Sequence, residues 1–240
     1  MTEALQLDHV YLINVRSFTE RLAHAGAQLA RFGLNAEPVH EWDAADITRE
    51  VDRRYFNPGN LTPGQKSCCM KHVAALQRIV EREERYALVL EDDIVLADAF
   101  AEGVKAALAE APKNPQPQVI FIGCGGNFYT PRSQRKPGQR LYLANRGRFA
   151  DSYIISHETA RLRLDWIERN RISKPIDNQF EDIDRAAGIT MLWLEDPVVE
   201  QGSKLGLFDT TLEPAHPGWL QKLLFKLEKF RRKYVYQIWR

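Results

Sequence analysis

Cysteine is scarce in this chain of 240 residues, which contains only Cys68, Cys69 and Cys124. An odd number, with two of the residues adjacent, argues against a disulfide framework and favours a reducing compartment. The CxxC pairs and the Cys/His spacings typical of zinc sites are missing too. We therefore expect no structural zinc site.

Long apolar runs and a basic leader are also missing. No stretch approaches the roughly 18 apolar residues that a membrane-spanning helix needs. The opening MTEALQLDHVYLINV has Glu3 and Asp8 where a signal peptide would carry Lys or Arg. We expect a cytoplasmic protein.

The chain has almost no net charge, because its 33 basic and 32 acidic residues nearly cancel. These charges are unevenly distributed along the sequence. Residues 218–240 hold seven Lys or Arg and one Glu. Removing these from the totals leaves a body of net charge −5 and a tail of +6. We expect one domain over residues 1–217, followed by a basic appendage over 218–240. An acidic body makes nucleic acid a poor partner.

The tail has the pattern of a basic amphipathic helix. From Leu220 to Ile238 apolar residues recur at helical spacing, and lysines recur at the same spacing on another face. With Trp219 and Trp239 at its ends, such a helix typically lies in the interface of an anionic membrane. The alternative is a C-terminal helix that packs on the body or forms a dimer contact.

The body alternates strand-like and helix-like segments, which implies an α/β fold with a mainly parallel central sheet flanked by helices. Short apolar runs predict strands in 9–15, 36–44, 86–91, 118–123 and 189–195, and 151–170 predicts a strand followed by a helix. Helical spacing predicts helices over 17–32, 63–84 and 98–111. Thr62, Pro63 and Gln65 form a capping box at one helix start. The Gly-rich, basic stretch 123–140 predicts a long surface loop.

The stretch YALVLEDDIVL carries three consecutive carboxylates, Glu91, Asp92 and Asp93, at the end of an apolar strand. Ligands of open α/β sheets bind beyond the carboxyl ends of the strands. Negative charges gathered there are costly unless a cation offsets them. Mg²⁺ and Mn²⁺ prefer carboxylate oxygens and often share their coordination shell with phosphates. The alternative is a solvated strand end with helix-capping carboxylates.

LVLEDD resembles the metal-binding acidic motif of glycosyltransferases with the GT-A (nucleotide-diphospho-sugar transferase) fold. Further segments are similar to one family, glycosyltransferase family 25, the lipooligosaccharide galactosyltransferases. LINVRSFTER resembles its opening block, in which Ile13, Asn14 and Arg21 match. LTPGQKSCCMKH resembles its helical block through Cys69 and His72, although Lys71 stands where the family usually has Ser.

The resemblance continues towards the C-terminus. SYIISHETA is similar to the family's strand after the mid-chain loop, KPID to its Pro-x-Asp element and DPVVEQGS to its closing Pro…Gln…Ser element. Together these motifs cover roughly residues 8–205 in the family's order.

The resemblance implies a metal-dependent, inverting glycosyltransferase. It would move a hexose, galactose from UDP-galactose in the first instance, onto a lipooligosaccharide or another cell-surface glycan. Asp93 would be the direct ligand of Mn²⁺ or Mg²⁺. Asp92 and Glu91 would be a second ligand, a group supporting the ligands or a contact to the sugar or ribose. The residues implied at the UDP-sugar are Ile13, Asn14, Arg21, His72, Glu91 and Asp92.

An inverting transfer needs a general base that deprotonates the acceptor hydroxyl. Asp177 is the first candidate because it lies in KPID, and Asp182 is the second. Asp182 belongs to NQFEDIDRAAG, which has the pattern of a helix start, so its carboxylates are also explained by the helix dipole. Lys71 and His72 would either contact the diphosphate or be ordinary surface residues of their helix. Gln201 would lie near the metal or the acceptor.

Two other functions compete with this one. The acidic strand end would also suit another metal-dependent nucleotidyl or phosphoryl enzyme. The Lys71 departure leaves room for a membrane-tethered, non-catalytic module that binds sugar nucleotides. For the transferase, the tail implies peripheral association with the inner face of the cell membrane, beside a glycolipid acceptor.

Overall fold

The computed structural model describes residues 5–111, 117–125, 129–144, 149–203 and 205–208, and the single residues 227, 230, 231 and 234. A seven-stranded sheet with the order β2-β1-β3-β7-β5-β8-β6 forms the centre of the fold. Its strands are β1 (His9–Ile13), β2 (Glu37–Val39), β3 (Ala87–Glu91), β5 (Gln118–Phe121), β6 (Leu141–Leu143), β7 (Ser152–Ile155) and β8 (Thr190–Leu194). Only β6 and β7 run against the other five, so the prediction of a mainly parallel sheet is confirmed.

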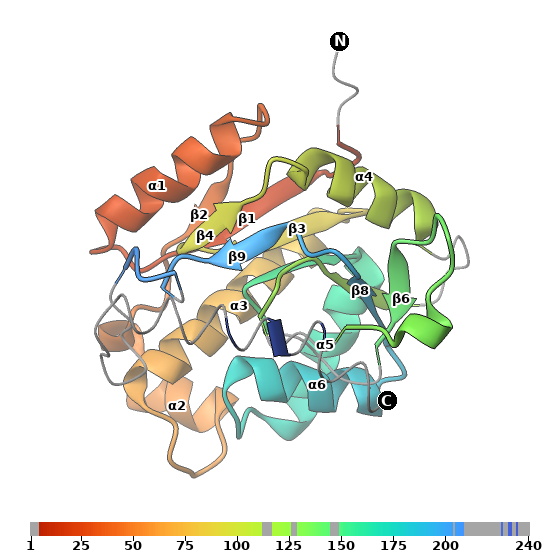
Figure 1. Cartoon of the computed structure of the whole chain (residues 1–240). Coiled ribbons are helices and arrows are strands. Elements are labelled where there is room, and N and C mark those ends of the chain that lie inside the picture. Colours follow the sequence, from red (N-terminus) through yellow and green to blue (C-terminus); the bar gives the residue numbers. More distant parts are fainter. Residues whose placement is uncertain are drawn as a thin grey trace.

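Helices cover both faces of the sheet (Figure 1). One face carries α2 (Arg49–Tyr55), α3 (Pro63–Glu81), α5 (His157–Asn170) and α6 (Ile176–Ala186), and the other carries α1 (Thr19–Ala30) and α4 (Phe100–Glu110). Side chains alternate along each strand. Tyr11 and Val89 therefore join the core under α3, while Leu12 and Leu88 join the core under α1 and α4.

The central helix α3 begins as its sequence predicts. The Thr62 side chain accepts a hydrogen bond from Gln65 N, the Gln65 side chain accepts one from Thr62 N, and Pro63 occupies the first turn. This reciprocal capping satisfies two backbone donors that a helix start leaves open. The helical spacing predicts a buried stripe of Cys69, Val73, Leu76 and Val80, of which the first three are buried and Val80 is partly buried.

A small ribbon of β4 (Ile94–Leu96) and β9 (Val199–Gln201) lies beside the main sheet. Its antiparallel register pairs Ile94 with Gln201. The pairing joins the segment after the three carboxylates to the DPVVEQGS segment. Neither of these three-residue strands was expected from the sequence, and Figure 1 shows them side by side.

Three other expectations need correction. Residues 49–55 form α2, for which no element was expected. The stretch 123–140 includes the buried residues Tyr129 and Thr130, so part of it lies in the interior instead of on the surface. The helix expected to start within NQFEDIDRAAG begins at Ile176, which places Asp177 in its first turn and Asp182 in its middle.

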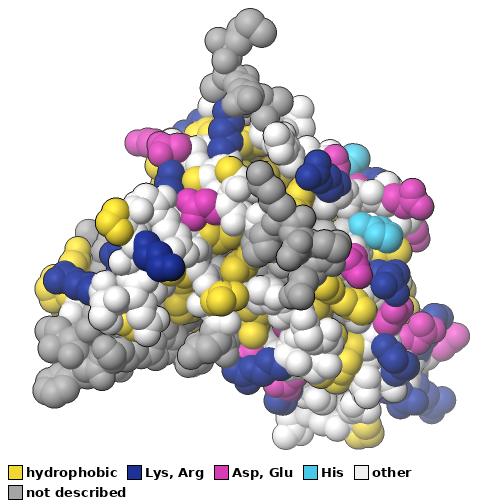
Figure 2. Space-filling view, turned by 90° about the vertical axis from the view of Figure 1, so that its right-hand side faces the viewer, with side chains coloured by type: hydrophobic (Ala, Val, Ile, Leu, Met, Phe, Trp, Pro, Cys, Tyr) yellow, Lys and Arg dark blue, Asp and Glu magenta, His cyan; other side chains and the backbone are white. Residues whose placement is uncertain are grey.

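The surface of the body mixes charges of both signs. Basic and acidic side chains are interspersed on the face shown in Figure 2. Among the residues that the structure describes, no helix is both long and apolar enough to cross a membrane. The tail, residues 218–240, lies outside the described residues except for Leu227, Phe230, Arg231 and Tyr234.

Candidate active site

A cleft of about 450 Å³ lies at the carboxyl ends of β1 and β3. Its walls also include the first turns of α3, the start of α6 and the end of β9. Parallel strands place their carboxyl ends at one edge of the sheet, which is where open α/β folds bind ligands. Most of the predicted site residues line this cleft: Ile13, Asn14, Arg21, Glu91, Asp92, Asp93 and Asp177.

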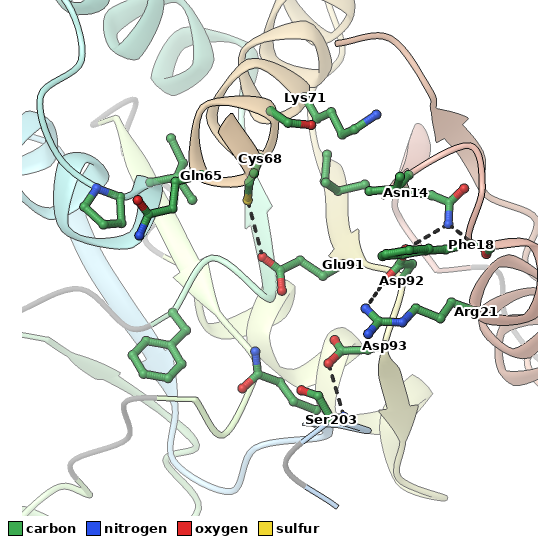
Figure 3. Close-up of a pocket in the computed structure, with 18 of the residues that line it drawn as sticks. Asn14, Phe18, Arg21, Gln65, Cys68, Lys71, Glu91, Asp92, Asp93 and Ser203 are labelled. Atoms are coloured by element: carbon green, nitrogen blue, oxygen red, sulfur yellow. Dashed lines mark hydrogen bonds and ion pairs between the residues drawn. The ribbon is translucent and has the colours of Figure 1, made fainter. Parts of the chain in front are cut away.

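Asp92 ties three elements together (Figure 3). Asn14 Nδ2 donates to Asp92 Oδ2 at 2.8 Å, and Arg21 Nη1 donates to Asp92 Oδ1 at 3.2 Å. Asn14 Oδ1 in turn lies 3.0 Å from His40 Nε2. Burial raises the pKa of Asp92, although Arg21 and Asn14 oppose the shift. Both oxygens of Asp92 are therefore engaged with the protein before any ligand arrives.

Asp93 differs from its neighbour because one of its oxygens is left over. Ser203 N donates to Asp93 Oδ2 at 3.2 Å, and Gly202 N donates to the Asp93 backbone carbonyl. Asp93 Oδ1 is buried and has no hydrogen-bond partner among the described residues. A side chain at Gly202 would place its Cβ 2.8 Å from the Asp93 carbonyl oxygen, so this close approach requires glycine.

Asp151, which the sequence analysis missed, adds a further carboxylate. It directly precedes β7 and is 1% exposed. Burial raises the pKa of Asp151 to about 8, and Asp177 and Asp93 add to the shift. Its Oδ1 also lacks a hydrogen-bond partner among the described residues. A Cβ at Gly123 or Gly125 would lie 2.1 Å or 2.6 Å from its oxygens, so the GCGG stretch makes room for this carboxylate.

The carboxylates act on one another electrostatically. Burial and the carboxylates of Asp93, Asp177 and Asp151 raise the pKa of Glu91 well above its ordinary value. Burial also raises the pKa of Asp177. Carboxylates that raise one another's pKa in a buried site favour a bound cation, because the cation removes their repulsion.

The residues present fit a hard divalent cation. Asp93 and Asp151 each carry a buried oxygen without a partner among the described residues, and both are the hard ligands that Mg²⁺ and Mn²⁺ prefer. Asp93 also lines the cleft, where a ligand has access to it. The predicted role of Asp93 as the direct metal ligand stays a prediction that this geometry supports. The engaged oxygens of Asp92 fit a supporting role better than direct coordination.

The two candidate bases occupy different surroundings. Asp177 lines the cleft, and its Oδ1 accepts a hydrogen bond from Ala150 N at 2.6 Å. Asp182 is 39% exposed and pairs with Lys174. Asp182 is not among the residues that line the cleft. Of the two, only Asp177 is placed to reach a substrate there.

His72 and Lys71 take up positions that the sequence did not suggest. His72 is fully buried, and its Nδ1 lies 3.0 Å from Tyr153 Oη, so it lies beneath the cleft and not on the surface of the helix. Lys71 is 1% exposed and its ammonium points away from the carboxylates (Figure 3). Lys71 Nζ lies 2.8 Å from Asp43 Oδ1 and donates to the carbonyls of His40 and Glu41. Lys71 is therefore no surface lysine, but it is among the residues that line the cleft, and its contact with a diphosphate stays a prediction.

The start of α3 gives the cleft a positive end. Gly64 and Gln65, in the first turn, line the cleft opposite the carboxylates. The backbone N–H groups of a helix start and the helix dipole favour anions. Arg21 adds a positive charge, with its guanidinium over the rings of Phe18 and Phe208 at 4.8 and 5.3 Å. Negative and positive groups therefore face the same space, as a cation–phosphate pair requires.

Comparison with known families agrees with the motifs. The sequence matches the model of glycosyltransferase family 25, described as LPS biosynthesis protein, over residues 7–180. A "Glycosyltransferase 25 family member" of Anopheles gambiae is 27% identical over 135 residues, which cover 50% of this chain and 22% of that protein. One of Drosophila pseudoobscura pseudoobscura is 28% identical over 131 residues, covering 50% of this chain and 21% of that protein. The match thus spans about a fifth of the length of these relatives.

Solved structures resemble the chain in overall course. A Drosophila beta1,4-galactosyltransferase 7 mutant in complex with manganese, UDP-Gal and xylobiose gives a TM-score of 0.44 at 13% identity, covering 89% of this chain and 78% of that one. The inositol-1-phosphate CTP transferase of T. maritima gives 0.41 at 9% identity, covering 92% and 97%. Both similarities concern the course of the backbone and give no information about the residues of the site.

Proposed function

The chain belongs to glycosyltransferase family 25, and on that premise we propose that its cleft transfers a hexose from a UDP-sugar to a glycan hydroxyl with inversion at the anomeric carbon. The proposal depends above all on one observation. Glu91, Asp93 and Asp177 line one cleft with the first turn of α3, so negative and positive groups converge on the same space.

The departing diphosphate needs its charge neutralised. Asp93, with Asp151, would hold a divalent cation, Mn²⁺ or Mg²⁺, which acts as a Lewis acid on the phosphate oxygens when bound. The N–H groups at the start of α3 would take part of the same negative charge. Asn14 and Arg21 hold Asp92, which keeps the turn after β3 in place for Asp93. We further propose that Ile13, Asn14 and Arg21 border the nucleotide.

Asp177 is the proposed general base. Its carboxylate would take the proton of the acceptor hydroxyl while the hydroxyl oxygen attacks the anomeric carbon, and the bond from that carbon to the diphosphate oxygen breaks as UDP leaves. Burial raises the pKa of Asp177, which makes the carboxylate a better proton acceptor near neutral pH. The hydrogen bond from Ala150 N at 2.6 Å holds one oxygen and leaves the other for the acceptor.

For the donor and acceptor we propose UDP-galactose and a lipid-linked cell-surface glycan such as lipooligosaccharide. The family model is described by LPS biosynthesis, whereas the names of the insect relatives state no acceptor. The basic, amphipathic pattern of residues 218–240 supports an acceptor that is held at a membrane.

Release of UDP tests the proposal. The full chain is incubated with a glycan acceptor and with UDP-galactose, UDP-glucose or nucleoside triphosphates, in the presence of Mn²⁺ or of a chelator. A transferase releases UDP from a UDP-sugar only with the metal. Release of pyrophosphate from a triphosphate would instead favour a nucleotidyl enzyme. Tight binding of the UDP-sugar without turnover, even when glycan acceptors are supplied, would favour a binding module.

A further inference from the structure

Three side chains at the cleft, Cys68, His72 and the carboxylate of Glu91, have a different chemistry from the rest of the site. Cys68 and His72 lie four residues apart on α3, so they share one face of the helix, and that face meets Glu91 at the end of β3. Cys68 Sγ lies 4.0 Å and His72 Nε2 3.9 Å from Glu91 Oε1. The three potential ligand atoms all lie within 4.8 Å of one another.

The imidazole of His72 is held in an orientation that suits a metal ligand. Its Nδ1 is 3.0 Å from Tyr153 Oη, and its ring packs between those of Tyr153 and Phe180, with centroid distances of 5.8 Å to each. Its Nε2 is fully buried and has no hydrogen-bond partner among the described residues. A hydrogen bond at one ring nitrogen of a ligating histidine commonly fixes the orientation of the other. Here the other nitrogen, Nε2, faces Glu91.

One long hydrogen bond, from Cys68 Sγ to Glu91 Oε1 at 4.0 Å, lies within the trio. It leaves His72 without a bond to the other two, because His72 Nε2 and Glu91 Oε1 are too far apart for a hydrogen bond at 3.9 Å. Burial lowers the pKa of His72 to about 3, so the imidazole is neutral at pH 7 and its nitrogen can act as a ligand. Three ligand atoms are thus gathered at separations that leave room for an ion between them.

We propose that Cys68, His72 and Glu91 bind a borderline-soft divalent cation, Zn²⁺, at a site distinct from that of Asp93. Thiolate, imidazole and carboxylate are the usual ligands of Zn²⁺, whereas Mg²⁺ and Mn²⁺ prefer oxygen. Binding would displace the thiol proton of Cys68 to solvent and leave the sulfur as a thiolate. The inference does not depend on the proposed transfer reaction.

The proposed site has an open side. Cys68 and Glu91 line the cleft, whereas His72 supports the site from beneath. Three protein ligands leave the fourth tetrahedral position of Zn²⁺ free, which is the pattern of reactive and not of purely structural zinc sites. Because Cys68 and Glu91 line the cleft, water or an oxygen of a bound anion could reach the ion from there and complete the shell.

Cobalt is a spectroscopic probe for this site, because Co²⁺ takes tetrahedral positions and a thiolate ligand gives it an intense charge-transfer absorption. The full chain, freed of metal and kept reduced, is titrated with Co²⁺. We expect the absorption to saturate at one Co²⁺ per chain and to disappear when Zn²⁺ is added. Absence of the absorption in the wild-type chain would overturn the proposal without any variant.

Four variants test the assignment. Cys68→Ser should abolish the absorption, whereas Cys69→Ser, which alters the adjacent buried thiol, should keep it. Asp93→Asn should also keep it, because this change removes an oxygen ligand of the other proposed site and no thiolate. Persistence of the band in Cys68→Ser, or its loss in Cys69→Ser or Asp93→Asn with the fold intact by circular dichroism, would contradict the assignment.

Glu91→Gln should lower the Co²⁺ affinity at least tenfold while the absorption persists at saturation, and an unchanged affinity would remove Glu91 from the site.

Discussion

Asp92 and Asp93 are adjacent in the chain but have different partners. Asn14 and Arg21 occupy both oxygens of Asp92, whereas Asp93 receives one hydrogen bond from Ser203 N and keeps a buried oxygen without a partner among the described residues. A buried charge without a partner is costly. A bound cation would offset this cost, because it would coordinate the Asp93 oxygen that has no hydrogen-bond partner among the described residues.

Asp177→Asn should retain binding of metal and UDP but lose transfer. The carboxylate is proposed to act on the acceptor proton and not on the nucleotide, and loss of a general base lowers turnover by about 10²–10⁴-fold. Initial rates with a saturating UDP-sugar, together with UDP binding by calorimetry, check this prediction.

Asp182→Asn is the matched control on the same helix, because Asp182 is partly exposed and pairs with Lys174. Its rate should stay within about twofold of wild type, since a surface ion pair contributes at most about 1 kcal/mol to stability and nothing to the cleft. If Asp182→Asn loses transfer while Asp177→Asn keeps it, the two roles must be exchanged.

Asp151→Asn should stabilise the metal-free chain, and more so at high pH. Burial raises the pKa of Asp151 to about 8, so from its ordinary value up to pH 8 the folded chain binds a proton that the unfolded chain releases. The contribution of Asp151 to the free energy of unfolding therefore falls as the pH rises through this window. Asparagine does not titrate and avoids this loss.

Thermal unfolding in the presence of a chelator measures the effect. At pH 8 we expect Asp151→Asn to melt above wild type by at least about 2–4 °C, which corresponds to about 1 kcal/mol for a chain of this size. The difference should shrink towards pH 5. A difference that is absent at pH 8, or that grows as the pH falls, would contradict the assigned environment of Asp151.

At the scale of elements, the buried ammonium of Lys71 on α3 binds the segment that follows β2. Lys71 Nζ contacts Asp43 Oδ1 at 2.8 Å and donates to the carbonyls of His40 and Glu41. His40 also contacts Asn14, which holds Asp92. The lysine thus supports one wall of the cleft without facing its carboxylates.

Lys71→Met should lower the free energy of unfolding by about 2 kcal/mol, because the carbonyls of His40 and Glu41 lose their buried donor, whereas Asp43 keeps its ion pair with Arg16. Lys66→Met is the control on the same helix. Lys66 pairs with Asp52 near the surface, so its loss should cost less than about 1 kcal/mol. Urea unfolding of both variants measures the two values, and equal losses would show that the burial of Lys71 has no energetic importance.

The sequence predicts the longer elements because their patterns are local. The apolar runs at β1, β3 and β8 and the capping box of α3 are contiguous, and the three carboxylates mark the edge of the sheet where the cleft lies. The three-residue strands β4, β6 and β9 contain too few residues for a period and form because their partners lie beside them.

The parts of the site that sequence reasoning missed depend on distant segments. Asp151 is significant only because Gly123 and Gly125 leave it space, and a lone Asp before a strand does not indicate this. The Lys71 ammonium is buried against the carbonyls of Val39, at the end of β2, and of His40 and Glu41 just after it, which no helical pattern reveals. The neighbours of Cys68 are His72, four residues later on α3, and Glu91 at the end of β3. Only the fold brings Glu91 to that face of the helix.

At the scale of the whole molecule, an acidic body of residues 1–217 is followed by a basic tail of residues 218–240. The role of this tail in membrane binding remains a proposal. Among the described residues of the tail, Leu227, Phe230 and Tyr234 are exposed by 55%, 59% and 42%. All three belong to the apolar stripe expected for an amphipathic helix. Exposed apolar side chains among lysines and arginines suit the interface of an anionic membrane.

Truncation after Pro217 should weaken membrane binding and spare catalysis on soluble acceptors, because every described residue that lines the cleft precedes residue 204. Co-sedimentation with anionic and neutral vesicles compares the two forms. We expect the full chain to bind anionic vesicles more tightly, with about 1 kcal/mol from each basic residue near the surface, and high salt to weaken this binding only in part. Equal sedimentation of both forms, or aggregation of the truncated body, would place the tail in the core instead.

The central claim is that Asp93 holds a cation to which the nucleotide diphosphate binds. The most direct measurement is calorimetric titration of UDP into the wild-type chain and Asp93→Asn, each with Mn²⁺ and with a chelator. We predict that Mn²⁺ strengthens UDP binding by wild type at least about 100-fold, equivalent to about 2.7 kcal/mol, and that Asp93→Asn loses this gain while keeping its fold. A UDP affinity that does not depend on Mn²⁺, or that Asp93→Asn leaves unchanged, would contradict the account.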